Sequence, residues 1–269
     1  MNNIIVRTLS GAVLIIFVLG SILINSWTMV LCFGIFTVLA LSEFYNFFQN
    51  TETVSVSKPA GIAVGLILFS IFAFMLLDRI PMSLILLVIF FSLFSLFLSE
   101  IWRKKLNPLL NLGVYTSSYI YIILPFLIMI LIAMAFGKIL LATMFILIWT
   151  NDTFAYLSGR FFGKTKLFPR ISPNKTREGS IGGAILTVLM ALVICYFVDQ
   201  QYVLWTGAAL VISISSNLGD LLESLFKRSV NVKDSGNIMP GHGGILDRFD
   251  ASLIAAPFFY CWLVIYSYF

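Results

Sequence analysis

Residues 82–99 read MSLILLVIFFSLFSLFLS, an apolar run without a charged residue. A helix needs about 20 such residues to cross a bilayer, and the run does not alternate between apolar and polar positions as the strand of a membrane barrel would. The same character extends along the chain, because 60% of its 269 residues are hydrophobic and only 11% are charged. Such a chain cannot cover a water-facing surface, so we expect an all-α membrane protein.

Nine hydrophobic runs predict a polytopic protein with about nine transmembrane helices. They cover residues 8–25, 27–48, 60–77, 82–99, 109–134, 139–159, 181–198, 202–226 and 250–268. The fifth run is long and contains Pro125, so it is either one kinked helix or two shorter pieces.

The positions of Lys and Arg predict the orientation of these helices. With the N-terminus in the cytoplasm, fifteen of the seventeen Lys and Arg residues fall in cytoplasmic segments, and only Arg79 and Lys138 fall on the other side. The opposite topology would invert this positive-inside distribution. The net charge of +5 therefore reflects membrane orientation and does not indicate a nucleic-acid partner.

Polar residues become denser near residue 150, which divides the chain into two predicted parts. Residues 1–149 form a scaffold of hydrophobic helices, where contacts between subunits would lie. Residues 150–269 carry the chemistry, with two charged, Gly-rich cytoplasmic loops at 160–180 and 227–249. Glu43 is an intramembrane acid outside any motif, and it is expected to pair across helices or at a subunit interface.

The eighth predicted helix carries a polar stripe. Its polar residues recur three or four positions apart, which places them on one helical face: Ser213, Asn217, Asp220, Ser224 and Lys227. Carboxylates inside a membrane span are costly, so this face must turn toward protein or a water-filled cavity. Serine and asparagine alone would indicate hydrogen bonds between helices, whereas the additional acids Asp220 and Glu223 favour a functional site.

The segment that follows concentrates glycine, basic residues and acids. Residues 224–250 read SLFKRSVNVKDSGNIMPGHGGILDRFD. Gly-rich backbone beside Lys and Arg is typical of phosphate binding, and Asp247, Asp250 and Asp220 would supply the oxygen ligands that suit Mg²⁺. Each feature has a simpler explanation as a turn or a helix cap, but their concentration favours a site.

Residues 224–250 resemble the signature of the phosphatidate cytidylyltransferases, also called CDP-diacylglycerol synthases. Residues 151–164 and 172–180 fit the same family. The resemblance implies an enzyme of the bacterial cytoplasmic (inner) membrane that converts CTP and phosphatidic acid into CDP-diacylglycerol and pyrophosphate in phospholipid biosynthesis. It also implies a cytoplasmic active site, Mg²⁺ as cofactor with or without a second cation, and a homodimer in the lipid bilayer.

Together with the stripe and the loop, the resemblance gives roles to individual residues. The expected catalytic residues are Asp220, Lys227, Asp247 and Arg248, and the expected metal ligands are Asp220, Glu223, Asp247 and Asp250. The expected substrate contacts are Asp152, Arg160, Ser172, Lys175, Thr176, Arg177, Glu178, Asn217, Ser224, Arg228, Lys233, His242, Gly243 and Gly244. The phosphate of phosphatidic acid is already ionised, so its attack on the α-phosphorus of CTP needs positioning and charge neutralisation but no general base.

Several of these roles have alternatives. The positive-inside rule alone explains cytoplasmic lysines and arginines. His242 would act as a base, or would donate to phosphate or order the loop. Asp152 would either contact substrate or metal or form a structural hydrogen bond. Glu178 would either contact CTP or cap a helix.

Two other functions fit part of the sequence. A CTP-dependent polyprenol or phytol kinase would share the membrane, the metal and the nucleotide, but it would need a base for the acceptor hydroxyl, and the long match over 224–250 argues against it. A secondary transporter would also carry intramembrane carboxylates, but it should show two related halves, whereas polarity here is confined to one half.

Overall fold

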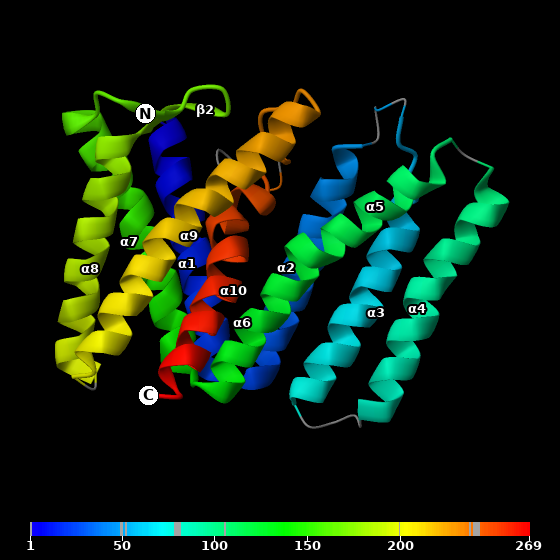
Figure 1. The fold of residues 1–269 in the computed structure, drawn as a ribbon, viewed down its shortest axis with the longest axis horizontal. Helices are drawn as coiled ribbons and strands as arrows, with labels where there is room; N and C mark the ends of the chain where they lie inside the picture. Colours follow the sequence, from blue (N-terminus) through cyan, green and yellow to red (C-terminus); the bar gives the residue numbers. More distant parts are fainter. Residues whose placement is uncertain are drawn as a thin grey trace. The chain divides into compact units, whose positions relative to one another are not determined.

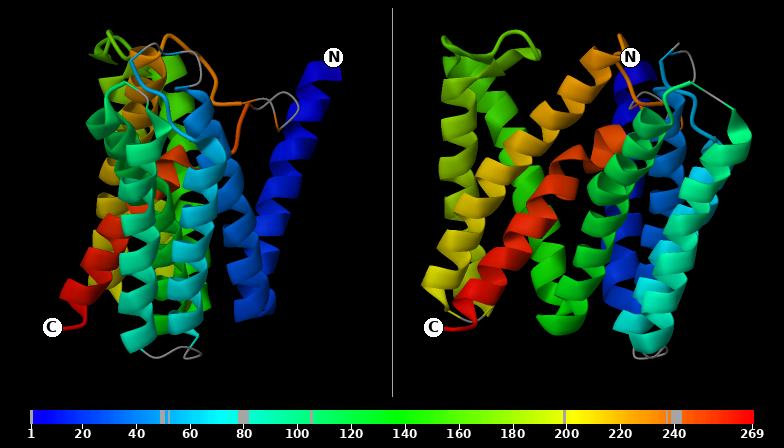
Figure 2. Two further views of the ribbon diagram at one scale, coloured as in Figure 1. Left: turned by 90° about the vertical axis from the view of Figure 1, so that its right-hand side faces the viewer. Right: turned by 45° about the vertical axis from the view of Figure 1, so that its right-hand side comes forward.

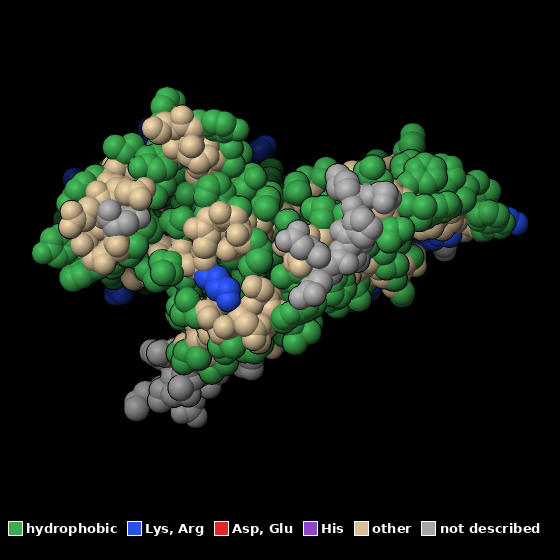
Figure 3. All heavy atoms as spheres, turned by 90° about the horizontal axis from the view of Figure 1, so that it is seen from below, with side chains coloured by type: hydrophobic (Ala, Val, Ile, Leu, Met, Phe, Trp, Pro, Cys, Tyr) green, Lys and Arg blue, Asp and Glu red, His purple; other side chains and the backbone are tan. Residues whose placement is uncertain are grey.

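A computed structural model of the chain describes residues 2–48, 51, 53–77, 82–104, 106–198, 200–236, 238 and 243–269, without the side chains of residues 2–9, 82 and 83. Apart from one two-stranded hairpin, the regular elements in this part of the chain are helices (Figure 1). Eight helices are long and apolar enough to cross a membrane, and the shorter apolar stretch Ser10–Ile24 precedes them. Hydrophobic side chains also dominate the face shown in Figure 3. The prediction of an all-α membrane protein with about nine spans is confirmed.

The chain forms two compact units, which we describe separately. Unit 1 comprises Met1–Ala135 and Val230–Arg248, and unit 2 comprises Phe136–Ser229 and Phe249–Phe269. Residues 230–248, which make up most of the predicted loop 227–249 and are called the signature loop below, therefore group with the N-terminal helices. The functional division near residue 150 stays a prediction.

Unit 1 is built from helices that pack side by side. They are α1 (Asn2–Ile24), α2 (Ser26–Asn46), α3 (Lys58–Leu76), α4 (Met82–Arg103), α5 (Pro108–Ser118), the π-helix η1 (Tyr119–Ile123) and α6 (Leu124–Ala135). α3 packs against α2, α4 and α6, and α3 and α4 run alongside each other in Figures 1 and 2. Aromatic side chains fill the core, including Phe33 and Phe126, whose ring centroids are 5.7 Å apart.

The fifth predicted span is one continuous helix with a local π-helical turn. α5 runs into η1 and η1 into α6, and the whole segment Pro108–Ala135 is a single candidate span. Pro125 gives the physical reason, because it has no N–H to donate to the carbonyl of Tyr121 and its ring crowds that carbonyl. The helix widens directly before the proline and then continues.

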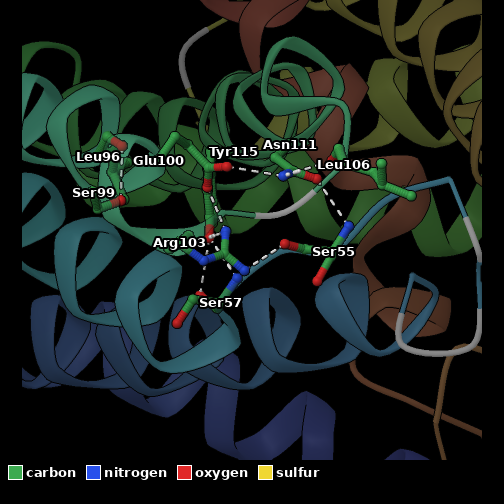
Figure 4. Close-up of polar contacts among 9 residues, drawn as sticks. All are labelled: Ser55, Ser57, Leu96, Ser99, Glu100, Arg103, Leu106, Asn111 and Tyr115. Carbon is green, nitrogen blue, oxygen red and sulfur yellow. Dashed lines mark hydrogen bonds and ion pairs between the residues drawn. The ribbon is translucent and has the colours of Figure 1, made fainter.

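A polar cluster ties the segment after α2 to α4 and α5 (Figure 4). Arg103 forms an ion pair with Glu100 and donates to the carbonyl of Ser55. The amide of Asn111 donates to Glu100 at 2.9 Å and accepts from the N–H of Ser55 at 2.8 Å. The side chain of Glu100 is only 4% exposed, so its charge is compensated inside unit 1, where burial of an unpaired charge would be costly.

Unit 2 consists of a helical group and a small sheet. Its elements are α7 (Lys138–Phe162), β1 (Lys166–Phe168), β2 (Ser172–Thr176), α8 (Arg177–Val198), α9 (Tyr202–Ser229) and most of α10 (Leu246–Tyr266). α8 packs against α7 and α9. A methyl group on Gly179 would lie 2.8 Å from the carbonyl oxygen of Ala155 and 3.0 Å from the Cα of Gly159, so small residues allow α7 and α8 to approach closely.

The antiparallel hairpin β1–β2 was not predicted from the sequence. Lys166 pairs with Thr176 and Phe168 with Ser172. This pairing replaces the irregular loop that we expected over residues 160–180, because the backbone groups of the segment satisfy one another and do not depend on water alone.

Candidate active site

Four carboxylates on three helices of unit 2 form an acidic cluster. Asp250 on α10 interacts electrostatically with Asp152 on α7 and with Asp220 and Glu223 on α9. Two lysines compensate the charge. The Nζ atom of Lys175 lies 2.5 Å from Oδ2 of Asp220, and that of Lys227 lies 2.5 Å from Oε2 of Glu223. The structure thus brings together six of the residues that the sequence selected: Asp152, Lys175, Asp220, Glu223, Lys227 and Asp250.

The cluster forms where α9 and α10 nearly touch. A methyl group on Gly219 would lie 2.5 Å from the carbonyl oxygen of Asp250 and 3.0 Å from the Cα of Ala251. Only glycine allows this approach, because any side chain would collide with backbone. Gly219 therefore places Asp220 beside the helix that carries Asp250.

The hairpin brings Lys175 to α9. The carboxylate of Glu178 accepts hydrogen bonds from the N–H groups of Lys164 at 3.1 Å and Thr165 at 3.0 Å. The hydroxyl of Thr176 accepts a hydrogen bond of 3.2 Å from the N–H three residues later, as a helix N-cap does. These contacts fix both ends of the hairpin to the start of α8. Glu178 and Thr176 thus have a positional role, and their contact with substrate stays a prediction.

The polar stripe of α9 faces protein along part of its length, as expected. Ser213, Ser216 and Glu223 are buried. The amide of Asn151 on α7 donates to the hydroxyl of Ser216 at 3.0 Å, whereas the amide of Asn217 donates to the carbonyl of Ser213 in its own helix at 2.7 Å. Part of the stripe therefore holds helices together, and the C-terminal part of α9 carries the ion pairs.

In unit 1, the signature loop folds around Asp247. Its Oδ2 atom accepts hydrogen bonds from the N–H of Ser235 at 2.9 Å, from the hydroxyl of Ser235 at 2.9 Å and from the N–H of Gly244 at 2.8 Å. Gly243 has a φ of +81°, and a methyl group there would lie 2.5 Å from the same oxygen. Gly243 and Gly244 therefore allow the backbone to approach the carboxylate.

Glu43 is the residue that sequence reasoning missed. This side chain on α2 is 2% exposed. Its Oε1 accepts from the N–H of Ile245, and its Oε2 from the N–H of Leu246, both at 2.9 Å. The hydroxyl of Ser235 is 3.1 Å from Oε2. The described partners of Glu43 thus lie in the signature loop and at the first turn of α10. The high cost of an acid in a membrane span was the available signal.

For most of the other predicted residues the structure gives the degree of burial. Ser172 and Ser224 are half-buried, and Arg160, Arg177, Arg228, Lys233 and Arg248 are exposed, as is Asp152 of the acidic cluster. His242 lies outside the described residues. Asp220 and Asp247 belong to different units, so their convergence on one ion stays a prediction.

The donor set of the acidic cluster consists of carboxylate oxygens, which is the chemistry that Mg²⁺ requires. A group of like charges is also stabilised by a cation. Within the described ranges, however, no three His, Cys, Asp or Glu side chains are arranged to hold a metal ion as they lie. The residues therefore fit Mg²⁺ by their type, and the metal stays a prediction.

Comparison with known proteins decides the family. The model of the cytidylyltransferase family matches residues 5–266. The chain belongs to this family. Over 115 residues it is 52% identical to the phosphatidate cytidylyltransferase of Staphylococcus aureus (strain COL), and 51% identical to those of Staphylococcus haemolyticus (strain JCSC1435) and Staphylococcus saprophyticus.

The aligned segment covers 42% of this chain and 44% of each of these relatives, so the match spans less than half of their length. The resemblance found in residues 224–250 is confirmed at the level of the family. Together with the eight apolar helices, the bacterial relatives indicate an integral membrane protein.

Proposed function

We propose that this cytidylyltransferase-family protein joins CTP to phosphatidic acid and releases pyrophosphate, yielding CDP-diacylglycerol for phospholipid biosynthesis. The observation that carries the proposal is the cluster of unit 2, in which Lys175 and Lys227 lie against carboxylates on α9. Its combination of positive charge and oxygen donors suits a triphosphate with its counterion. The names of the relatives support the choice of substrates.

The chemistry requires one bond to form and one to break. An oxygen of the phosphatidic acid phosphate attacks the α-phosphorus of CTP, and the bond from the α-phosphorus to the oxygen of the departing pyrophosphate breaks. The nucleophile is already an anion, so no residue has to remove a proton from it. Lys175 and Lys227 would offset the charge that builds up on the leaving group.

Mg²⁺ belongs to the same proposal. Asp220 and Asp247 would be its ligands, with Glu223 and Asp250 as further oxygen donors. When bound, the ion would neutralise phosphate oxygens. A second cation in the acidic cluster would act in the same way.

The proposal includes an active site that faces the cytoplasm of a bacterium, since CTP is a soluble anion and phosphatidic acid arrives through the bilayer. The enzyme is further proposed to act as a homodimer in the inner membrane.

The test is the product. Purified protein in detergent is mixed with CTP, phosphatidic acid and Mg²⁺, with EDTA added to a parallel sample. We expect CDP-diacylglycerol and pyrophosphate in the first sample, and neither with EDTA. Incubation of CTP with polyprenol or phytol instead should give no reaction. Release of CDP and formation of a phosphorylated alcohol would show a lipid kinase, and absence of turnover with all acceptors would refute the proposal.

A further inference from the structure

Glu43 connects two separate points of the signature loop. Its two carboxylate oxygens hold the N–H groups of Ile245 and Leu246, where α10 begins, and one of them also contacts the hydroxyl of Ser235. An acid that is 2% exposed needs such donors, because a buried carboxylate without them would be strongly destabilised. The contacts therefore fix α2 and the loop to each other.

The hydroxyl of Ser235 extends this connection to Asp247. Its Oγ atom lies 3.1 Å from Oε2 of Glu43 and 2.9 Å from Oδ2 of Asp247. The N–H of Ser235 also donates to Oδ2 of Asp247. The position of Ser235 is therefore shared by the two acids, and a displacement of Glu43 must be transmitted to Asp247.

We propose that Glu43 is a positioning residue for Asp247, acting through Ser235 and the first turn of α10. The dependence of activity on this role rests on the proposed function, whereas the effect on the loop itself does not. In this role Glu43 acts through Asp247 and not on the substrate. It fixes the orientation of a carboxylate on which the reaction depends, as residues around a ligand set commonly do.

The substitution Glu43→Gln tests the geometry with nearly unchanged volume. A glutamine has only one acceptor oxygen, so its NH₂ group must face one of the two N–H groups that Glu43 now binds. Ile245 or Leu246 loses its partner, and the start of α10 is no longer fixed.

Glu100→Gln is the matched control. Glu100 is also a glutamate of unit 1, its side chain is only 4% exposed, and its partners are the side chains of Arg103 and Asn111. Its contacts lie in the polar cluster of α4 and α5, away from the signature loop. A loss of activity that results from neutralising any buried carboxylate would therefore appear in both variants.

We expect Glu43→Gln to lower kcat about 10- to 100-fold with little change in the KM for CTP, because an interaction that acts in the transition state is affected. Ser235→Ala should lower kcat as well. The kcat of the double variant should be no lower than that of the less active single variant, because both changes break the same connection. Glu100→Gln should keep the wild-type kcat per folded molecule.

Hydrogen–deuterium exchange gives a second measurement that does not need activity. The amides of Ile245 and Leu246 should exchange faster in Glu43→Gln than in the wild type and in Glu100→Gln. If Glu43→Gln does not fold, Ser235→Ala carries the test, because it keeps the backbone N–H contacts of Glu43 and of Asp247 and removes only the hydroxyl that contacts both carboxylates.

Wild-type exchange rates in Glu43→Gln, an unchanged kcat, or additive losses in the double variant would each overturn the proposal. If the wild type itself forms no CDP-lipid, the proposed function fails, and the exchange measurement still decides whether Glu43 fixes the loop.

Discussion

Gly219→Ala should separate α9 from α10 and thereby disturb the acidic cluster. The added methyl group would lie 2.5 Å from the carbonyl oxygen of Asp250 and 3.0 Å from the Cα of Ala251. Non-bonded heavy atoms are at their optimum about 3.5–4.0 Å apart. Both neighbours are backbone atoms, which cannot rotate away, so the helices must separate by on the order of 1 Å.

The expected effect on the rate is larger than that on stability. A misplacement of about 1 Å in an active site can cost about 10²-fold in rate, which corresponds to about 2.7 kcal/mol of activation free energy. Overpacking destabilises a protein by about 1–3 kcal/mol, and the better helix propensity of alanine offsets about 1 kcal/mol of this. Gly219→Ala should therefore form CDP-lipid about 10²-fold more slowly while remaining folded.

Steady-state formation of CDP-lipid from labelled CTP and thermal unfolding in detergent measure the two effects. Gly113→Ala on α5 is the control, because the methyl group that it adds has no neighbour within 4 Å apart from the adjoining backbone of its own helix. It should keep the wild-type rate and an equal or higher unfolding temperature. A wild-type rate in Gly219→Ala would show that the close approach of α9 and α10 is not needed for activity.

Three further predictions follow from the sequence and the candidate site. In a cysteine-free variant, single cysteines introduced at 160–180 or 227–249 should react with an impermeant reagent only after the inner leaflet is opened; labelling from outside intact cells would refute the orientation. CTP or dCTP should support turnover and ATP should not, as measured by product formation; equal use of ATP would favour the kinase. Asp220→Asn and Asp247→Asn should each lower turnover about 10²- to 10⁴-fold, with Glu100→Gln as the control; near-normal activity of both variants at limiting Mg²⁺ would exclude the metal site.

The helices were predictable because their signal is local. A run such as 82–99 specifies a membrane helix by its own length and composition. The spacing of polar residues in α9 likewise depends only on the helical repeat. Even the interruption of the fifth span follows from one residue, Pro125, although the sequence alone did not distinguish a π-helical turn from two separate pieces.

The hairpin and the partners of Glu43 were not predictable because they depend on contacts between distant or weakly patterned residues. β2 reads Ser-Pro-Asn-Lys-Thr, a stretch without the alternation that marks a strand. Its pairing is stabilised by Glu178 and by the start of α8. Glu43 and Ile245 are separated by 202 residues, and no periodicity in a single sequence encodes such a pair.

Asp220 and Asp247, the two acids proposed as metal ligands, have different kinds of partners, so their contributions to stability should differ. Asp220 is paired with Lys175, and the two side chains are 36% and 22% exposed; ion pairs at such positions contribute only about 0–1 kcal/mol. Asp247 accepts from three donors, two of which are backbone N–H groups. Asp247→Asn would turn an NH₂ group toward these donors or weaken every bond to them, and a buried donor without a partner costs about 1–3 kcal/mol.

Asp220→Asn should therefore leave the unfolding temperature nearly unchanged, whereas Asp247→Asn should lower it, although both abolish most turnover. Thermal unfolding of the two variants in the same detergent measures the difference. Equal unfolding temperatures would show that the hydrogen bonds around Asp247 do not stabilise the loop. A larger fall in the unfolding temperature of Asp220→Asn would show that the ion pair with Lys175 stabilises the protein more than an exposed pair does.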